Sequence, residues 1–125
     1  MATDYIVKIE ESSREFTARE RLMFKDFSNA SQLDTLCDSE IPVRISPVDY
    51  AILSVHNDKS KDKKDYRKFV IIDKAGNKFI TGSESFIKAY KEIKDEMGDE
   101  EFEIDCYKVP SKNYVGKSFI TCSIV

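Results

Sequence analysis

The chain has 125 residues, of which 41% are hydrophobic and 34% charged, and its formal net charge is −3. This length suits one domain with a core of its own, so residues 1–125 are expected to form a single domain. No segment approaches the roughly 20 apolar residues that a membrane-spanning helix needs, and residues 1–10 have neither the basic nor the apolar stretch of a signal peptide. The sequence therefore predicts a cytoplasmic protein without a membrane partner.

The residue types that most often carry catalysis or bind metals are sparse. Cys37, Cys106 and Cys122 are odd in number and widely spaced, unlike a disulfide framework or a zinc site, and they suit a reducing compartment. His56 is the only histidine. The phosphate-binding loops G-x-x-x-x-G-K-[ST] and G-x-G-x-x-G are both absent. We therefore expect no enzymatic activity, no cofactor and no bound metal.

The first third of the chain begins with a short strand over residues 5–9. Residues 15–27 are ambiguous, because Ala18, Leu22 and Met23 would suit a helix, whereas the alternation around Leu22 would suit a strand. The alternation favours a strand. The polar residues 28–40 are then expected to form a loop.

The middle of the chain predicts strands over residues 41–55, 66–73 and 78–81. Pro47 cannot donate to a strand ladder, so the first of these strands should bend or break there. Residues 56–65 are charged and should form an exposed loop. Residues 74–77, K-A-G-N, have the composition of a tight turn.

One amphipathic helix follows, with Ser83 or Ser85 as its N-cap and Gly98 at its C-terminal end. Its apolar residues are spaced by four, three and four, which is one helical stripe, and they are Phe86, Tyr90, Ile93 and Met97. Strands over residues 102–109 and 117–125 complete the chain, joined by the turn-rich residues 110–116. Strands with one helix before the last two strands predict a mainly β fold, an OB-like five-stranded barrel.

Charge is unevenly distributed along the sequence. Seven acids and no base lie within residues 95–105, namely Asp95, Glu96, Asp99, Glu100, Glu101, Glu103 and Asp105. Residues 59–68 carry six bases against two acids, and the bases are Lys59, Lys61, Lys63, Lys64, Arg67 and Lys68. Three more bases and no acid lie within residues 108–117. A locally basic surface can attract a polyanion although the whole chain is acidic.

Three stretches of the chain resemble one protein family. They are T-A-R-E-R-L-M-F-K-D (17–26), V-I-I-D-K-A-G-N-K-F-I-T-G-S-E-S-F (70–86) and Y-K-V-P-S-K-N-Y-V-G-K-S-F-I-T-C-S-I-V (107–125). In this order they are similar to single-stranded DNA-binding proteins of tailed bacteriophages of Gram-positive bacteria. The resemblance covers most of residues 15–125.

This resemblance implies an OB-fold that binds single-stranded DNA with little sequence preference. It implies a role in phage replication or recombination in the host cytoplasm, with phage or host replication or recombination proteins as further partners. Bacterial single-stranded DNA-binding proteins usually end in an acidic tail that recruits partners, whereas this chain ends in an apparent strand. Recruitment through a tail is therefore not expected. Self-association through Ile124 and Val125 stays open.

Binding of this kind requires cations that neutralise phosphates and aromatic rings on which bases stack, each stacked base contributing about 1–3 kcal/mol. The chain interleaves the two residue types. The candidate DNA-binding residues are Arg44, Tyr66, Arg67, Lys68, Phe69, Lys78, Phe79, Tyr107, Lys108, Lys112, Asn113, Tyr114 and Lys117.

Each candidate also has a purely structural interpretation. Phe69 and Phe79 suit the core as well as a binding face, and Arg44 suits an ion pair as well as a phosphate contact. Tyr107 should point outward, and Tyr114, in a loop beside Lys112, is the strongest single candidate. A competing hypothesis is a protein-binding or host-inhibitory module that uses the acidic residues 95–105.

Overall fold

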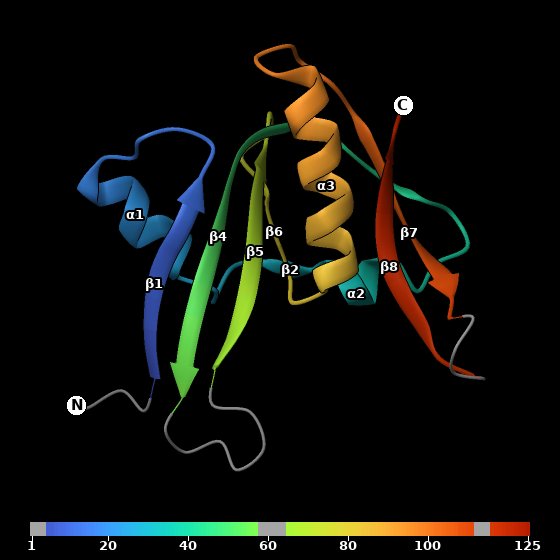
Figure 1. Ribbon diagram of the computed structural model, residues 1–125, viewed down its shortest axis with the longest axis horizontal. Helices are drawn as coiled ribbons and strands as arrows, with labels where there is room; N and C mark the ends of the chain where they lie inside the picture. The colour runs from blue at the N-terminus through green and yellow to red at the C-terminus, as the bar shows by residue number, and fades with distance from the viewer. Residues whose placement is uncertain (1–4, 58–64, 112–115) are drawn as a thin grey trace.

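The computed structural model describes residues 5–57, 65–111 and 116–125 (Figure 1). Eight strands in these ranges form two sheets. The first sheet has the order β1 (Tyr5–Ser12), β4 (Pro47–Asn57), β5 (Asp65–Asp73), β6 (Lys78–Thr81) and β2 (Ser31–Gln32). The second has the order β3 (Val43–Ile45), β7 (Ile104–Pro110) and β8 (Ser118–Ile124). All ladders are antiparallel except that between β2 and β6.

The two sheets are joined by one bent segment. β3 pairs with β7, and β4, which begins only two residues after β3 ends, pairs with β5 in the other sheet. The ladder of β4 shifts register between Pro47 and Asp49, as expected where a proline interrupts the donors. The predicted bend at Pro47 is therefore confirmed. No ladder joins β6 to β8 among the described residues, so the two sheets do not close into a barrel. The predicted mainly β fold is confirmed, whereas the predicted OB-like five-stranded barrel is not.

Helix α3 (Glu84–Met97) lies between the two sheets, as Figure 1 shows. Ser83 caps it by accepting a hydrogen bond from the Phe86 backbone at 3.2 Å, and Gly98 ends it with φ of 60°. The predicted helix and both caps are confirmed. Phe86 and Tyr90 are buried against Tyr50 and Phe69 of the first sheet, with ring centroids of the helix and sheet residues 5.0 to 5.8 Å apart. Ile104, Cys106, Ile120 and Cys122 of the second sheet complete this main core.

The predicted strand over residues 15–27 is wrong, because the chain forms α1 (Ala18–Lys25) there. Thr17 and Glu20 cap this helix reciprocally: the Glu20 backbone donates to the Thr17 hydroxyl, and the Thr17 backbone donates to the Glu20 carboxylate. Such a capping box favours a helix start whatever the following alternation. Phe24 of α1 stacks on Phe16 at 4.5 Å, and the pair covers the face of the first sheet that lies opposite α3.

The predicted loop over residues 28–40 contains β2 and the one-turn helix α2 (Leu33–Leu36). Leu33 and Cys37 enter the main core. Asp34 accepts a hydrogen bond from Thr81 of β6 at 2.7 Å, and Asp38 forms an ion pair with Lys108 of β7. This segment therefore connects the two sheets on the side where β6 and β8 do not pair. No helix within the described residues is long and apolar enough to cross a membrane.

Candidate nucleic-acid interface

Strand β5 places an aromatic ring and a cation next to each other on one face. Tyr66 and Lys68 are two residues apart, so their side chains leave the same face of the sheet. Both are half-buried, and the Lys68 Nζ lies 5.8 Å from the centroid of the Tyr66 ring. Lys68 forms no ion pair with an acid in the part of the chain that the structure describes. A ring with a neighbouring cation is the combination that a stacked base and its phosphate require.

Farther along the same face of β5, the surface is covered. Val70 follows Lys68 on this face, and it is buried in a second core, which it forms with Phe16, Phe24, Ala51, Leu53 and Ile80. Ile72 packs against that core as well. The open part of this face is therefore limited to the end of β5 that carries Tyr66 and Lys68, which we call the β5 patch.

Arg67 lies on the opposite face of β5 and is held by two acids. Its guanidinium donates to Glu84 at 2.6 and 3.2 Å and lies 3.6 Å from Glu10. The hydrogen bonds that Arg67 donates to Glu84 are the main reason why the pKa of Arg67 is raised. The structure therefore uses Arg67 to fasten the start of α3 to β5, and a phosphate would have to displace Glu84.

Two candidates are not on the surface. Phe69 is fully buried at the centre of the main core, so its ring is not available to a base. Lys78 is 7% exposed, and its Nζ donates to Met23 O, Asp26 O and Asn29 Oδ1 at 2.5–3.1 Å. These two assignments are corrected: Phe69 is a core residue, and Lys78 fastens the end of α1 to β6.

Phe79 has an intermediate position. It packs against the main core and also lines a cavity of about 650 Å³ with Met23, Asn29 and Asn77. Lys78, which lines the same cavity, already donates to backbone and amide oxygens. This cavity therefore offers apolar and amide groups without a cation available for a phosphate among its lining residues.

The outer face of the second sheet carries further candidates. Arg44 donates to Asp105 at 3.0 and 3.3 Å. This is the structural ion pair that the sequence suggested as the alternative to a phosphate contact. Tyr107 points outward as predicted, and its hydroxyl lies 2.5 Å from the Ser123 hydroxyl. Phe119, which the sequence did not single out, is 39% exposed on the same face. Only its alternation with the buried Ile120 could have indicated this position.

The remaining candidates lie at or near the β7–β8 connection. Lys108 is paired with Asp38, whereas Lys117 is exposed and forms no ion pair with a described residue. Lys112, Asn113 and Tyr114 lie outside the described residues. Tyr114, the strongest candidate from sequence, is therefore not placed.

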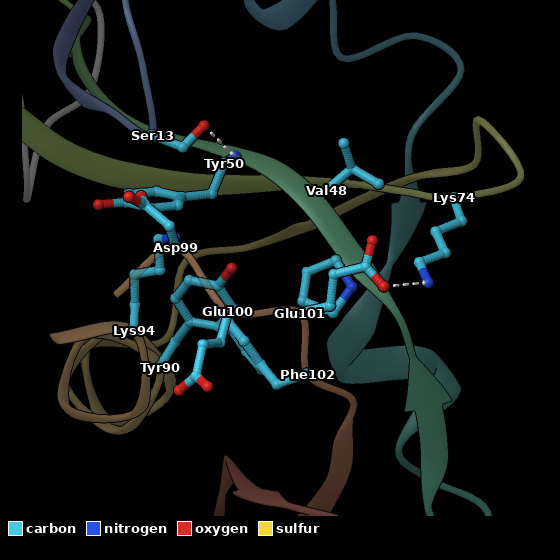
Figure 2. Close-up of a pocket in the computed structure, with 11 residues that line it drawn as sticks. Ser13, Val48, Tyr50, Lys74, Tyr90, Lys94, Asp99, Glu100, Glu101 and Phe102 are labelled. Carbon is cyan, nitrogen blue, oxygen red and sulfur yellow. Dashed lines mark hydrogen bonds and ion pairs between the residues drawn. The ribbon is translucent and has the colours of Figure 1, made fainter. Parts of the chain in front are cut away.

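Several of the acidic residues 95–105 form ion pairs or hydrogen bonds within the fold. Asp105 binds Arg44, Glu101 binds Lys74 at 3.0 Å, and Glu103 accepts from Ser46 at 2.9 Å. Asp99, Glu100 and Glu101 also line a cavity of about 180 Å³ whose wall includes Tyr50 and Tyr90 (Figure 2). Lys74 and Lys94 line the cavity too, but Lys74 pairs with Glu101 and Lys94 donates to Gly98 O. The carboxylates of Asp99 and Glu100 therefore make this cavity an unfavourable place for a phosphate.

The cysteines do not form a reactive site. All three thiols are buried, and burial raises the pKa of Cys122 to about 12. Burial also raises the pKa of Cys37 and of Cys106. Within the described ranges, no group of three or more His, Cys, Asp or Glu residues is arranged to hold a metal ion.

The buried thiols should react slowly with a thiol reagent, because the thiolate is the reactive form and here it is disfavoured. We expect the native protein to be labelled by Ellman's reagent only on the timescale of unfolding, and all three cysteines to react rapidly in concentrated urea. A thiol that reacts at the same rate in buffer and in urea would contradict the burial described here.

Several carboxylates have lowered pKa values in the fold. Hydrogen bonds from Arg14 are the main reason why the pKa of Glu20 falls from 4.5 to about 2. A hydrogen bond from Lys91 is the main reason why the pKa of Glu11 is lowered, and one from Arg44 has the same effect on Asp105. Each of these acids therefore favours the folded state most when it is ionised.

These shifts predict a loss of stability in acid. A folded-state pKa below the unfolded value contributes stability above the unfolded pKa, and this contribution is lost as the pH falls through the folded pKa. We expect the thermal midpoint, followed by circular dichroism, to fall between about pH 4.5 and pH 2. Glu20→Gln should make this dependence shallower. A midpoint that stays constant over that interval would show that these pairs do not form.

Comparison of the chain with protein-family models, with curated proteins and with solved structures gave no match.

Proposed function

We propose that this protein binds single-stranded DNA with little sequence preference, in the manner of the phage proteins that its sequence resembles. The observation that carries the proposal is the β5 patch, where Tyr66 and Lys68 lie side by side. The order in which the strands pair is the second observation that supports the proposal.

The ladders support an OB-like arrangement that is open on one side. If β3 and β4 count as one bent first strand, it pairs with the second strand (β5) and the fourth (β7). The second pairs with the third (β6), and the fourth with the fifth (β8). Helix α3 lies between the third and fourth strands in sequence. An OB-fold is a partly open five-stranded barrel, and here β2 and α2 lie beside the opening between β6 and β8.

In an OB-fold, oligonucleotides bind on the face of the second and third strands and on two connections, between strands one and two and between strands four and five. In this chain the β5 patch lies on the second strand. The first of those connections carries Lys59, Lys61, Lys63 and Lys64 in sequence, and the second carries Lys112 and Lys117. In Figure 1 the flanking ends of these strands all lie toward the lower end of the molecule, those of β4 and β5 on the left and those of β7 and β8 on the right. Cations at this end would attract the DNA strand whose bases stack on Tyr66.

The test is a fluorescence anisotropy titration of labelled oligo-dT with three variants. Tyr66→Leu keeps an apolar side chain but removes the flat ring, and it should weaken binding by about 1–3 kcal/mol, or about 5- to 150-fold. Lys68→Gln keeps the stem and removes the charge, and it should weaken binding and reduce the salt dependence. Lys88→Gln, the same change at an exposed position on α3, is the control and should bind like the wild type.

Two other outcomes have distinct meanings. Salt-sensitive binding that neither β5 variant weakens would move the site to residues 111–117 and the exposed Lys117. Absence of oligo-dT binding would overturn the proposal and favour the protein-binding alternative, for which Asp95, Glu96, Asp99 and Glu100 are exposed.

A further inference from the structure

Strand β8 is an edge of the second sheet, and no strand of the described residues pairs with the side of β8 that faces away from β7. At the two ends of its ladder with β7, Ser111 N donates to Lys117 O and Val125 N donates to Glu103 O, both within 3.0 Å. Because bonded and non-bonded pairs alternate in an antiparallel ladder, positions 119, 121 and 123 bond to β7. Ile120, Cys122 and Ile124 therefore direct their N–H and C=O groups to the open edge.

Part of this edge is already used inside the fold. The Ser83 hydroxyl donates to Ile120 O at 3.4 Å, which agrees with the assigned direction of that carbonyl. The backbone groups of Cys122 and Ile124 have no partner strand among the described residues. Two consecutive edge positions are thus available for a further strand.

An apolar groove runs beside the same edge, between β8 and α3, which are neighbours in Figure 1. Its volume is about 430 Å³, and its apolar walls are formed by Ala89, Ile93, Met97, Cys122 and Ile124. Ile124 is 49% exposed. A strand added to β8 could therefore place alternate side chains in this groove while its backbone bonds to the edge.

The acidic side chains that line the groove favour a basic occupant. Glu92 and Glu96 line it one helical turn apart, and neither forms an ion pair with a described residue. Like charges at this spacing destabilise a helix slightly, and a cation between them would relieve that repulsion. A second copy of this chain would bring the same acids and a net charge of −3, so a basic segment fits better.

We propose that the groove between α3 and β8 binds an extended, basic and apolar peptide segment of a partner protein by β-strand addition. The segment would alternate aliphatic residues, which enter the groove beside Ile93 and Met97, with lysine or arginine, which reach Glu92 and Glu96. Its backbone would pair with Cys122 and Ile124. The site is separate from the β5 patch, and it does not depend on DNA binding by this protein.

The probe is an array of peptides of about six residues, the usual length of a strand, that alternate Val, Ile or Leu with Lys, Arg or Thr. We expect a subset to bind the full chain and to slow hydrogen exchange of the Cys122 and Ile124 amides. The best binder should lose affinity at least about tenfold when its amides facing β8 are N-methylated, because strand addition requires them.

Two matched double variants reverse the charge of glutamates, one inside the groove and one outside it. Glu92→Lys with Glu96→Lys should weaken the same peptide at least about tenfold, and lysines near a helix C-terminus do not threaten the fold. Glu15→Lys with Glu100→Lys makes the same change at exposed positions outside the groove and should have a much smaller effect. The proposal is overturned if no peptide binds, if N-methylation is without effect, or if both double variants weaken binding equally. It is also overturned if β8 pairs with a second copy, seen as a dimer whose Cys122 and Ile124 amides are already protected.

Discussion

Replacing Phe69 by alanine is expected to lower the free energy of unfolding by about 3–5 kcal/mol, the usual cost of removing a buried phenylalanine ring. Phe69 is fully buried and contacts the rings of Tyr50, Phe86 and Tyr90. The change would therefore leave a cavity between the first sheet and α3. A domain of this size has a total stability of about 5–15 kcal/mol, so the substitution removes a large share of that stability. Urea unfolding followed by circular dichroism measures the difference.

The matched control is Phe119→Ala, the same substitution at a ring that is 39% exposed. It should cost clearly less than Phe69→Ala, because part of its apolar surface already contacts water. Equal losses for the two variants, or a Phe69→Ala protein that is as stable as the wild type, would contradict the core assignment. The latter result would return Phe69 to the candidates for base stacking.

Replacing Lys78 by methionine should cost about 1.5–3 kcal/mol, the range for hydrogen bonds made by a charged group. Methionine keeps most of the side-chain volume but leaves the Met23 and Asp26 carbonyls and the Asn29 amide oxygen without this donor. These acceptors lie at the end of α1 and just after it. We therefore expect α1 to become less protected against hydrogen exchange than β4 and β5.

Lys88→Met is the control, since Lys88 is exposed on α3 and exposed substitutions usually change stability by less than about 0.5 kcal/mol. If both methionine variants are equally stable, the buried lysine does not hold α1 to β6. A Lys78→Met protein that keeps its stability but loses DNA affinity would identify Lys78 as a phosphate contact.

The sequence predicted the elements whose pattern is local and strong. Strand β6 has the predicted bounds, and α3 has the predicted apolar stripe, N-cap and C-terminal glycine. Helix α1 was missed because it is short and buries a single residue, Phe24, while Leu22 and Met23 are exposed. Its capping box at Thr17 and Glu20 was the signal that could have identified it.

The candidate site was only partly predictable, for a geometric reason. Alternation along β5 separates Tyr66 and Lys68 from Arg67 and Phe69, but it does not say which face is covered. In this fold one face receives α3, and the other is partly covered by Phe16 and Phe24 from a segment far away in sequence. The partners of the cations are equally remote in sequence, as with Arg44 and Asp105 or Lys108 and Asp38. No local pattern encodes such pairs.

The ion pairs also explain how an acidic chain could present a small basic surface. Arg44, Arg67 and Lys108 are each matched by a carboxylate, so they contribute little net positive potential. Apart from the buried Lys78, which donates to carbonyl and amide oxygens, the candidate cations that form no such pair within the described residues are Lys68 and Lys117. Affinity for a phosphate backbone would then depend on these two and on the lysines of residues 58–64 and 112–115.

The central claim, binding of single-stranded DNA, is tested most directly by titrating labelled oligo-dT with the wild-type protein over a series of salt concentrations. We predict a straight line of log affinity against log salt concentration, with a negative slope of about 0.7 for each phosphate contacted. No binding at low salt, or an affinity that stays the same as salt rises, would contradict the claim.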